Sequence, residues 1–169
     1  MPDKQTIERA RKDKRQGKAA STQAGEFVRE EIDYIREGKH GARSTKQAIA
    51  IGLSMARRAG VNLKPPKKGM TSEKTRKGAA RAYARGHGAP ARAKASAKRS
   101  RATLQALKRE GRTAASPRAL AKQAHAAAGR RSSSQRSASA RRAVRTKGPA
   151  ERSAAARKAA RTREMHSHA

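Results

Sequence analysis

The side chains of this sequence that could take part in chemistry are mostly cations. The chain carries 44 Lys and Arg against 12 Asp and Glu, which gives a formal charge of +32. Ammonium and guanidinium groups bind phosphates, and so large a charge repels itself in a compact chain and attracts polyanions. The composition therefore indicates nucleic acid as the partner, with no cofactor and no small-molecule substrate.

The acidic side chains include one group that could be read as a cluster of catalytic carboxylates. This group comprises Glu30, Glu31, Asp33 and Glu37. At helical spacing such residues form a polar face, and they can also pair with the basic residues of the same chain. We therefore interpret them as a solvated helix face rather than as general acids or bases.

Other reactive groups are scarce. The absence of cysteine excludes disulfides, Cys-ligated zinc and thiol chemistry. His166 and His168 lack a third ligand, so no metal site is expected there, and His40 in its glycine turn is expected to face solvent. With one Phe and two Tyr, the chain has little interior in which catalytic groups could be preorganised. We therefore expect a protein that is not an enzyme.

Charge and hydrophobicity divide the chain into three parts. Residues 1–37 carry nine basic and eight acidic groups, so residues 38–169 carry the remaining +31. Large apolar side chains concentrate in residues 21–66, whereas residues 67–169 contain only seven of them. We predict a fraying charged helix within residues 1–20, a helical module at 21–66 and a basic low-complexity tail at 67–169.

The apolar part predicts a hairpin of two helices over about residues 22–60. Apolar side chains fall on one helical face in "GEFVREEIDYIREG", and the second helix is bounded by a capping box at 44–47 and by Gly60. Small residues that include Ala48 and Gly52 share one side of the second helix, where another helix could approach closely. The predicted seam of the hairpin consists of Phe27, Ile32, Ile35, Ile49, Leu53 and Met55.

The predicted hairpin is marginal on its own. Its apolar side chains are too few to offset the conformational entropy that is lost when the segment becomes ordered. We therefore expect a second copy of the chain or a partner protein to complete it.

The tail lacks the apolar residues of a second core, so we predict that it is mostly disordered when free. It contains 29 alanines, which favour helix, and 29 Lys and Arg, whose mutual repulsion opposes it. Start and stop signals mark nascent helices at 71–86, 101–111, 116–129 and 149–164. Neutralisation by phosphates would allow these segments to fold on binding. The Ser/Arg segment at 130–142 is interpreted as a flexible linker, with a phosphorylated or RNA-binding segment as the alternative.

The tail is also the predicted nucleic-acid-binding element. Its cations would neutralise phosphates along many base pairs and release counterions without reading sequence. The "GKHGAR" connection is longer than a helix-turn-helix uses, and aromatic side chains are too few for stacking on single-stranded bases. The predicted phosphate contacts are Arg57, Arg58, Lys67, Lys68, Lys74, Arg76, Lys77, Arg81, Arg85, Lys98, Arg99, Arg101, Arg130, Arg131, Arg141, Arg142, Arg157, Lys158 and Arg161.

Residues 25–69 carry a resemblance to a known group of proteins. They read "GEFVREEIDYIREGKHGARSTKQAIAIGLSMARRAGVNLKPPKKG" and resemble a bacterial family of short, highly basic proteins catalogued as a domain of unknown function. The hallmark of that family is the segment that reads "KQAIAIGLSMARRAG" here. The resemblance implies a bacterial source and an association with DNA in the nucleoid. Separately, the tail is similar in composition to the C-terminal tails of linker histones.

Three functions remain open from the sequence. The first is sequence-independent binding of duplex DNA, the second is a place among RNA- or ribosome-associated basic proteins, and the third is a protein-interaction module that its basic tail localises. The sequence has no apolar run of membrane-spanning length and no signal-peptide core at its N-terminus. We therefore expect a cytoplasmic, nucleoid-associated protein without a membrane partner.

Overall fold

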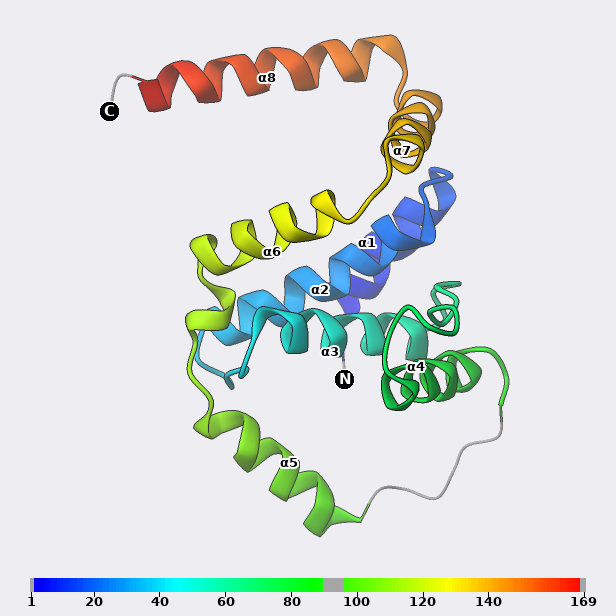
Figure 1. Cartoon of the computed structure of the whole chain (residues 1–169), viewed down its shortest axis with the longest axis vertical. Helices are drawn as coiled ribbons and strands as arrows, with labels where there is room; N and C mark the ends of the chain where they lie inside the picture. The colour runs from blue at the N-terminus through cyan, green and yellow to red at the C-terminus, as the bar shows by residue number, and fades with distance from the viewer. Residues whose placement is uncertain (1, 90–95, 168–169) are drawn as a thin grey trace. The chain divides into compact units, whose positions relative to one another are not determined.

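The computed structural model describes residues 2–89 and 96–167, and this part of the chain contains helices but no strand (Figure 1). The predicted all-α class is thereby confirmed. Backbone contacts divide the chain into two compact units, residues 1–126 and residues 127–169. The elements are α1 (Lys4–Arg15), α2 (Ala20–Arg36), α3 (Thr45–Arg58), α4 (Glu73–Gly86), α5 (Ala97–Arg109), the 3₁₀ helix η1 (Thr113–Ala115), α6 (Pro117–Gly129), α7 (Ser133–Thr146) and α8 (Pro149–Ser167).

Helices α2 and α3 pack against each other as a hairpin. The Ser44 side chain accepts a hydrogen bond from the Gln47 amide at 3.2 Å and so caps the start of α3. Beyond the end of α3, Gly60 adopts a φ of +86°, which favours glycine. Between the two helices, a Cβ atom at Gly52 would lie 2.6 Å from the Val28 Cα. The close approach of the helices therefore depends on the glycine.

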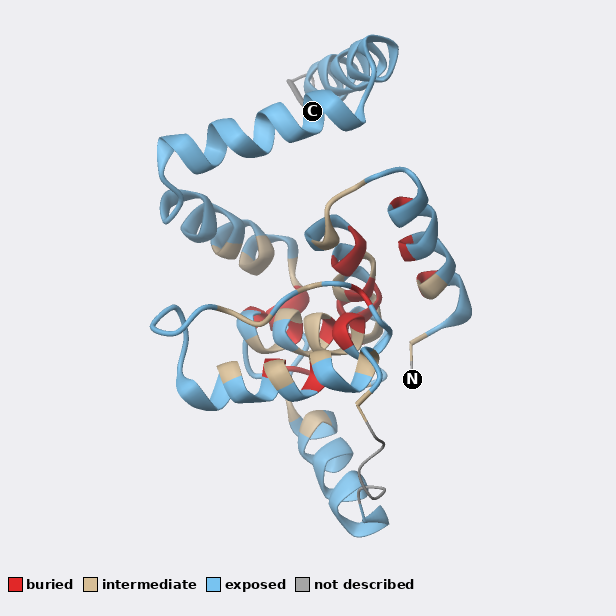
Figure 2. Ribbon diagram, turned by 90° about the vertical axis from the view of Figure 1, so that its right-hand side faces the viewer, coloured by how far each residue is buried: buried red, intermediate tan, exposed pale blue. Residues whose placement is uncertain are grey.

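The core of the first unit consists of two apolar clusters around this hairpin (Figure 2). The first contains Ile32, Ile35, Ala42, Ala48, Ala114 and Ala115, and the second contains Ala10, Ala24, Phe27, Ala56 and Val61. Among the predicted seam residues, Phe27, Ile32 and Ile35 are buried, whereas Ile49, Leu53 and Met55 are half-buried. The contact face of α3 is formed instead by its smallest residues, which the sequence had also placed on one side.

Helix α1 packs against α2 and buries more than its charged sequence suggested. Thr6 and Ala10 are almost completely buried on this face. One ion pair joins α1 to α2, with Arg9 Nε 2.8 Å from Glu26 Oε2. A second joins α1 to the turn that follows it, with Lys18 Nζ 2.6 Å from Asp13 Oδ1. The N-terminal segment thus covers part of the apolar surface that the hairpin alone would expose.

The prediction of a mostly disordered tail is wrong for the described residues, and α4 shows one reason. This helix packs against α3 and buries Ala79 and Ala82, while the Tyr83 hydroxyl donates a hydrogen bond to Asn62 Oδ1 at 2.7 Å. The end of α4 lies so close to the end of α3 that a Cβ atom at Gly86 would overlap the Arg57 carbonyl. Alanine and glycine permit this packing, although neither counts among the large apolar residues of a conventional core.

A second part of the tail completes the first apolar cluster. The Gly41 amide donates to the Leu107 carbonyl at 2.9 Å, and the Ala42 amide donates to the Gly111 carbonyl at 3.2 Å. Thr45 Oγ1 donates to the Ala114 carbonyl at 2.7 Å. Ala114 and Ala115 are buried beneath this contact. Backbone hydrogen bonds and buried alanine thus order a segment that has few large apolar side chains.

The second unit is helical without any buried residue among those whose burial is described. Helix α7 begins with a complete capping box, in which Ser132 and Gln135 exchange side-chain and backbone hydrogen bonds. The interpretation of residues 130–142 as a flexible linker is therefore wrong, since α7 occupies most of this segment. The high helix propensity of alanine and these caps account for helices that no tertiary packing supports.

Candidate nucleic-acid interface

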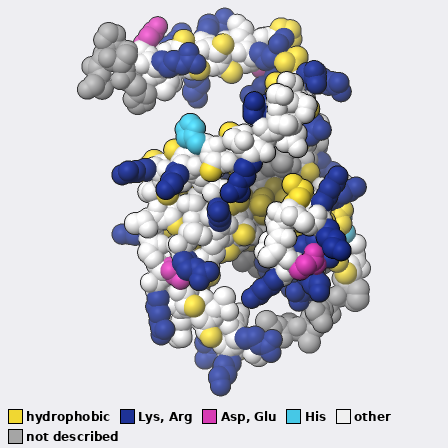
Figure 3. All heavy atoms as spheres, viewed as in Figure 1, with side chains coloured by type: hydrophobic (Ala, Val, Ile, Leu, Met, Phe, Trp, Pro, Cys, Tyr) yellow, Lys and Arg dark blue, Asp and Glu magenta, His cyan; other side chains and the backbone are white. Residues whose placement is uncertain are grey.

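Lys and Arg side chains are spread over the part of the described surface that Figure 3 shows, where they far outnumber Asp and Glu. Most of the predicted phosphate contacts are exposed. In the first unit these are Arg58, Lys67, Lys68, Lys74, Lys77, Arg81, Arg85, Lys98, Arg99 and Arg101. In the second unit they are Arg130, Arg131, Arg141, Arg142, Arg157, Lys158 and Arg161.

Two predicted contacts lie in different surroundings. Arg57 is buried, with 7% of its surface exposed, and its Nε donates to the Leu63 carbonyl at 3.0 Å. Its guanidinium therefore holds the loop after α3 and does not face the solvent. Arg76 is half-buried and forms two hydrogen bonds of 2.9 Å to the carboxylate of Glu73. A phosphate would have to compete with that carboxylate.

The ends of α3 and α4 bring two of the exposed cations together. Partial burial of the Arg58 side chain lowers its pKa, and the nearby charge of Arg85 lowers it further. The C-terminal ends of both helices are negative ends of helix dipoles, which partly offset the repulsion between the two guanidinium groups. A phosphate group that contacted both guanidinium groups would relieve this repulsion.

The second unit presents cations on opposite sides of its helix axes. On α8, Arg152, Arg157, Lys158 and Arg161 point at about 0°, 140°, 240° and 180° for a helix of 3.6 residues per turn. Residues 127–169 contain 12 Lys and Arg against two Glu. Such helices have no single polar face, and they suit contact with phosphates that surround them rather than with one flat surface.

The three aromatic side chains are already engaged within the first unit. Phe27 is buried, Tyr34 lies beneath the Lys39 ammonium at 3.9 Å, and Tyr83 stacks on His87 with ring centroids 3.9 Å apart. Base stacking on a protein needs an exposed aromatic face. The arrangement therefore favours contacts with the backbone of a nucleic acid over contacts with unstacked bases.

Two carboxylates of α2 are buried, contrary to the prediction of a solvated helix face. Glu30 and Glu31 are only 5% and 2% exposed, so they are not part of a solvated helix face. Glu30 Oε1 accepts hydrogen bonds from the Asp3 amide at 2.6 Å and from the Tyr34 hydroxyl at 2.9 Å. Burial, followed by the hydrogen bond to Glu30, raises the pKa of Tyr34. These contacts connect the start of α1 to the middle of α2.

Glu31 has fewer partners than Glu30, and each of the two acids has one buried carboxylate oxygen without a hydrogen bond among the described residues. Glu31 Oε2 lies 3.7 Å from His40 Nε2, and its Oε1 has no hydrogen-bond partner among the described residues. Burial raises the pKa of Glu31, His40 opposes that rise, and the charge of Glu30 adds to it. A helical spacing cannot distinguish a buried acid from an exposed one. The expectation that His40 faces solvent is also wrong, because its side chain is only 14% exposed and lies against Glu31.

The described residues offer no group of three His, Asp or Glu that could hold a metal ion. Of the histidine pair near the C-terminus, His168 lies outside the described residues. Nor does any described helix combine the length and apolar character needed to cross a membrane.

Comparisons with family models, with curated proteins and with solved structures found no match. The resemblance of residues 25–69 to the basic bacterial family therefore stays a prediction.

Proposed function

We propose that the protein binds nucleic acid without sequence specificity, that duplex DNA is its main target, and that it acts in the bacterial nucleoid without catalysing a reaction. The second unit carries this proposal: its helices bury no described residue, and they display 12 cations against two acids. A folded segment without a core gains no stability from its own packing. Phosphates that neutralise its charge would stabilise it.

The lack of sequence specificity follows from how the cations are presented. Lys and Arg side chains on mobile or fully exposed helices position a protein on phosphates, and phosphate contacts carry no direct sequence information. Reading base edges requires a helix held firmly in the major groove. The α2–α3 connection at 37–44 is longer than a helix-turn-helix uses, and it is closed by the segment that follows α5.

Duplex DNA is favoured over single-stranded nucleic acid because the aromatic side chains are engaged elsewhere. Binding that depends on phosphates alone tracks the spacing and density of charge, which is greatest on a duplex. Competition between duplex DNA and structured RNA for the full-length chain decides the separate question of DNA against RNA. A strong preference for the RNA would move the protein to the ribosome-associated class.

The test is the salt dependence of duplex binding by the full-length chain, measured by fluorescence anisotropy. Neutralisation of about ten phosphates gives a slope near −9 in a plot of log K against log salt. Replacing Arg157, Lys158 and Arg161 by Gln should reduce the slope by about 2.7, at roughly 0.9 for each lost phosphate contact.

The matched control replaces Ala154, Ala155 and Ala156 by Gln on the same helix, which leaves the charge unchanged. This variant should keep the slope of the parent. Duplexes of mixed and AT-rich sequence should bind within about threefold of each other. A shallow slope combined with a hundredfold preference for one sequence would refute the proposal.

A further inference from the structure

Two neighbouring hollows lie between α1 and the C-terminal end of α3. The larger, of about 390 Å³, is lined by Pro2, Ile7, Met55, Arg58 and Ala59. The smaller, of about 120 Å³, continues from Ile7 and Ala59 along α1 as far as Arg11 and Lys14. Because Ile7 and Ala59 line both hollows, the two meet there, and we call them together the α1–α3 groove.

The floor of the α1–α3 groove is apolar. Ala10, Phe27 and Val61 are buried members of the second apolar cluster. Ile7 and Met55 pack against the edge of this cluster and are half-buried. Part of their apolar surface therefore stays in contact with water, and covering it with another apolar surface would be favourable.

Three cations stand along the groove. At 100° per residue, Ile7, Arg11 and Lys14 fall within about 60° of one another, so the two cations follow the apolar floor along α1. Among the described residues, neither the Arg11 guanidinium nor the Lys14 ammonium makes a hydrogen bond or ion pair. Arg58, at the larger hollow, binds only Ser54 of its own helix, with Nε 3.2 Å from the carbonyl and Nη2 2.9 Å from the hydroxyl. Each hollow thus has a cation that is not paired with a carboxylate of the described chain.

The acidic side chains of α1 lie outside the groove. Within the described part of the chain, no Asp or Glu lines either hollow. Asp13 is buried and pairs with Lys18. Glu8 lies about 60° beyond Arg11, on the side away from Lys14. A carboxylate from a partner would therefore meet these cations without a competing acid in the groove.

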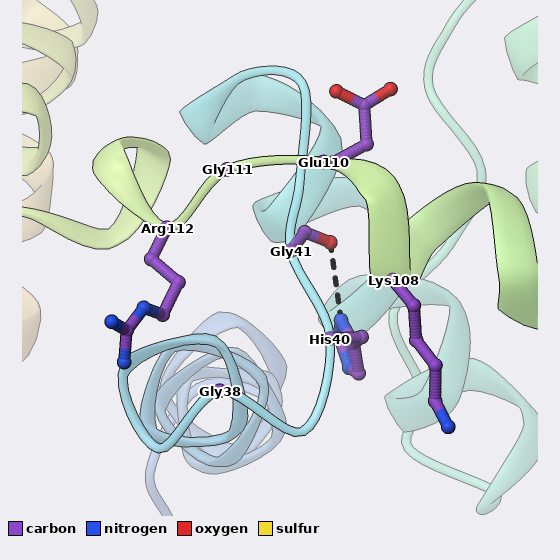
Figure 4. Close-up of a pocket in the computed structure, with 7 residues that line it drawn as sticks. All are labelled: Gly38, His40, Gly41, Lys108, Glu110, Gly111 and Arg112. Carbon is purple, nitrogen blue, oxygen red and sulfur yellow. Dashed lines mark hydrogen bonds between the residues drawn. The ribbon is translucent and has the colours of Figure 1, made fainter.

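A further hollow of the first unit shows the contrast (Figure 4). It has a volume of about 340 Å³ and lies between the turns at 38–41 and 108–112. Lys108 and Arg112 point away from each other on opposite sides of the 38–41 turn, and Glu110 also lines this hollow. An acidic partner would meet a carboxylate and diverging cations there. Lys108 is therefore suited to serve as a control for the cations of the groove.

We propose that the α1–α3 groove binds an acidic amphipathic helix of a partner protein. A helix in a groove presents apolar side chains at every third or fourth position, and these would cover Ile7 and Met55. Carboxylates on the flanks of that helix would face Arg58 at one hollow and Arg11 and Lys14 at the other. Charge complementarity of this kind favours one class of partner and fixes its register.

Two other occupants fit the groove less well. A second copy of the chain would bring its own charge of +32 to a cationic surface, so the two copies would repel each other. A fatty acid has a single carboxylate, which would pair with the cation of one hollow and leave those of the other without a partner. An acidic helix carries carboxylates along its length and can therefore meet the cations of both hollows.

The test uses two labelled peptides of about 18 residues, or five helical turns, with one composition of Leu, Ala and Glu. In the facial peptide the Leu residues share one helical face, and in the scrambled peptide they do not. Both peptides carry the same charge, so diffuse attraction to this basic chain acts on them equally. At physiological salt, where exposed charges are screened, the full-length chain should bind the facial peptide about tenfold more tightly. Fluorescence anisotropy measures both affinities.

Ala59→Gln should abolish the preference for the facial peptide. Ala59 is exposed at the C-cap of α3, so the longer side chain would fill the place where the two hollows meet without removing a core contact. The matched control is Ala50→Gln, an exposed alanine of the same helix that lines neither hollow. This variant should keep the tenfold preference, and unfolding temperatures show whether both variants keep the fold.

The charge of the partner is tested by Arg11→Gln combined with Lys14→Gln, which should weaken binding of the facial peptide about tenfold. The matched control combines Lys108→Gln with Arg109→Gln, which removes two exposed cations of α5 outside the groove. The control should bind the facial peptide like the parent. Arg11 and Lys14 are not among the proposed phosphate contacts, so the binding of DNA is a separate measurement that neither supports nor weakens this proposal.

Four results would overturn the proposal. Equal affinity of the parent for the two peptides would show that charge alone attracts them. Equal losses in the groove variants and their controls would place the binding elsewhere. Binding of oleate that Ala59→Gln abolishes, without a preference between the peptides, would assign the groove to an anionic amphiphile. A dimer in sedimentation that Ala59→Gln dissociates would assign it to a second copy of the chain.

Discussion

Gly52 of α3 lies directly against Val28 of α2, so that a methyl group at position 52 would sit 2.6 Å from the Val28 Cα and 2.9 Å from the Phe27 carbonyl oxygen. Both neighbours are backbone atoms, which cannot rotate away. The tight packing of the hairpin therefore depends on the absence of a side chain at position 52. The larger residues of α3, Ile49, Leu53 and Met55, lie beside this contact and are only half-buried.

Gly52→Ala should destabilise the first unit, because α2 and α3 would have to separate. Overpacking of this kind costs about 1 to 3 kcal/mol, or more when backbone must move. Thermal unfolding followed by circular dichroism measures the change. The control is Gly78→Ala in α4, where an added methyl group meets nothing within 4 Å. It should stabilise its helix by about 0.5 to 1 kcal/mol, and equal effects at both positions would contradict the packing described here.

Glu31→Gln should make the protein more stable at neutral pH. Because burial raises the pKa of Glu31 in the folded state, its contribution to stability is full below the pKa of the unfolded chain and is lost as the pH rises through the folded-state pKa. The amide carries no charge at any pH, so the gain should be larger at pH 7.5 than at pH 4.5. Unfolding temperatures at the two pH values provide the measurement.

Glu37→Gln serves as the control for that change, since Glu37 is an exposed acid at the C-cap of the same helix and pairs with Lys39. Surface ion pairs contribute about 0 to 1 kcal/mol, so its effect should be small at both pH values. If Glu31→Gln were instead less stable at pH 7.5, the attraction between Glu31 and His40 would outweigh the cost of burial.

Thr45→Val should weaken the attachment of the segment after α5 to the hairpin. The Thr45 hydroxyl is buried and donates to the Ala114 carbonyl, so valine would leave that carbonyl without its partner in a buried position. Such a loss costs about 1 to 3 kcal/mol. Amide hydrogen exchange at Gly41 and Ala42 should accelerate. Their amides donate to the Leu107 and Gly111 carbonyls, which belong to the segment that the Thr45 hydroxyl helps to hold in place.

The matched control is Thr103→Val on α5, where the hydroxyl is exposed and donates to the Arg99 carbonyl of its own helix. This change should leave exchange at Gly41 and Ala42 as it is in the parent. Unchanged exchange in Thr45→Val as well would mean that the two turns are held together by the backbone alone.

The contrast between the hairpin and the tail shows what the sequence could and could not predict. Helix starts at Ser44, Ser116 and Pro149 follow from capping chemistry, which acts locally and is visible in a few residues. The docking of residues 107–115 depends on backbone hydrogen bonds between segments distant in sequence, and no residue type marks these in advance. Alanine is also ambiguous, because it favours a free helix and packs equally well in a tight interface.

The candidate nucleic-acid interface also has features that the sequence predicts and features that it does not. The exposure of most predicted phosphate contacts follows from charge, because a cation is costly to bury without a partner. Arg57 departs from this rule because the Leu63 carbonyl provides such a partner. The packing of residues 107–112 against the turn at 38–42 could not be predicted, since it rests on backbone hydrogen bonds between segments distant in sequence.

Removal of residues 127–169 should leave the stability of the first unit unchanged and should weaken DNA binding. Every residue that closes the core of the first unit lies before position 127, so the shortened chain should unfold at nearly the temperature of the parent. The deletion takes away 12 cations, and the slope of log K against log salt should become shallower by about 0.9 for each phosphate contact that these cations make. Circular dichroism and anisotropy on one preparation test both expectations. The second unit would lose its assigned role if the shortened chain bound duplex DNA with an unchanged slope, and the exposed cations of α4 and α5 would then form the interface.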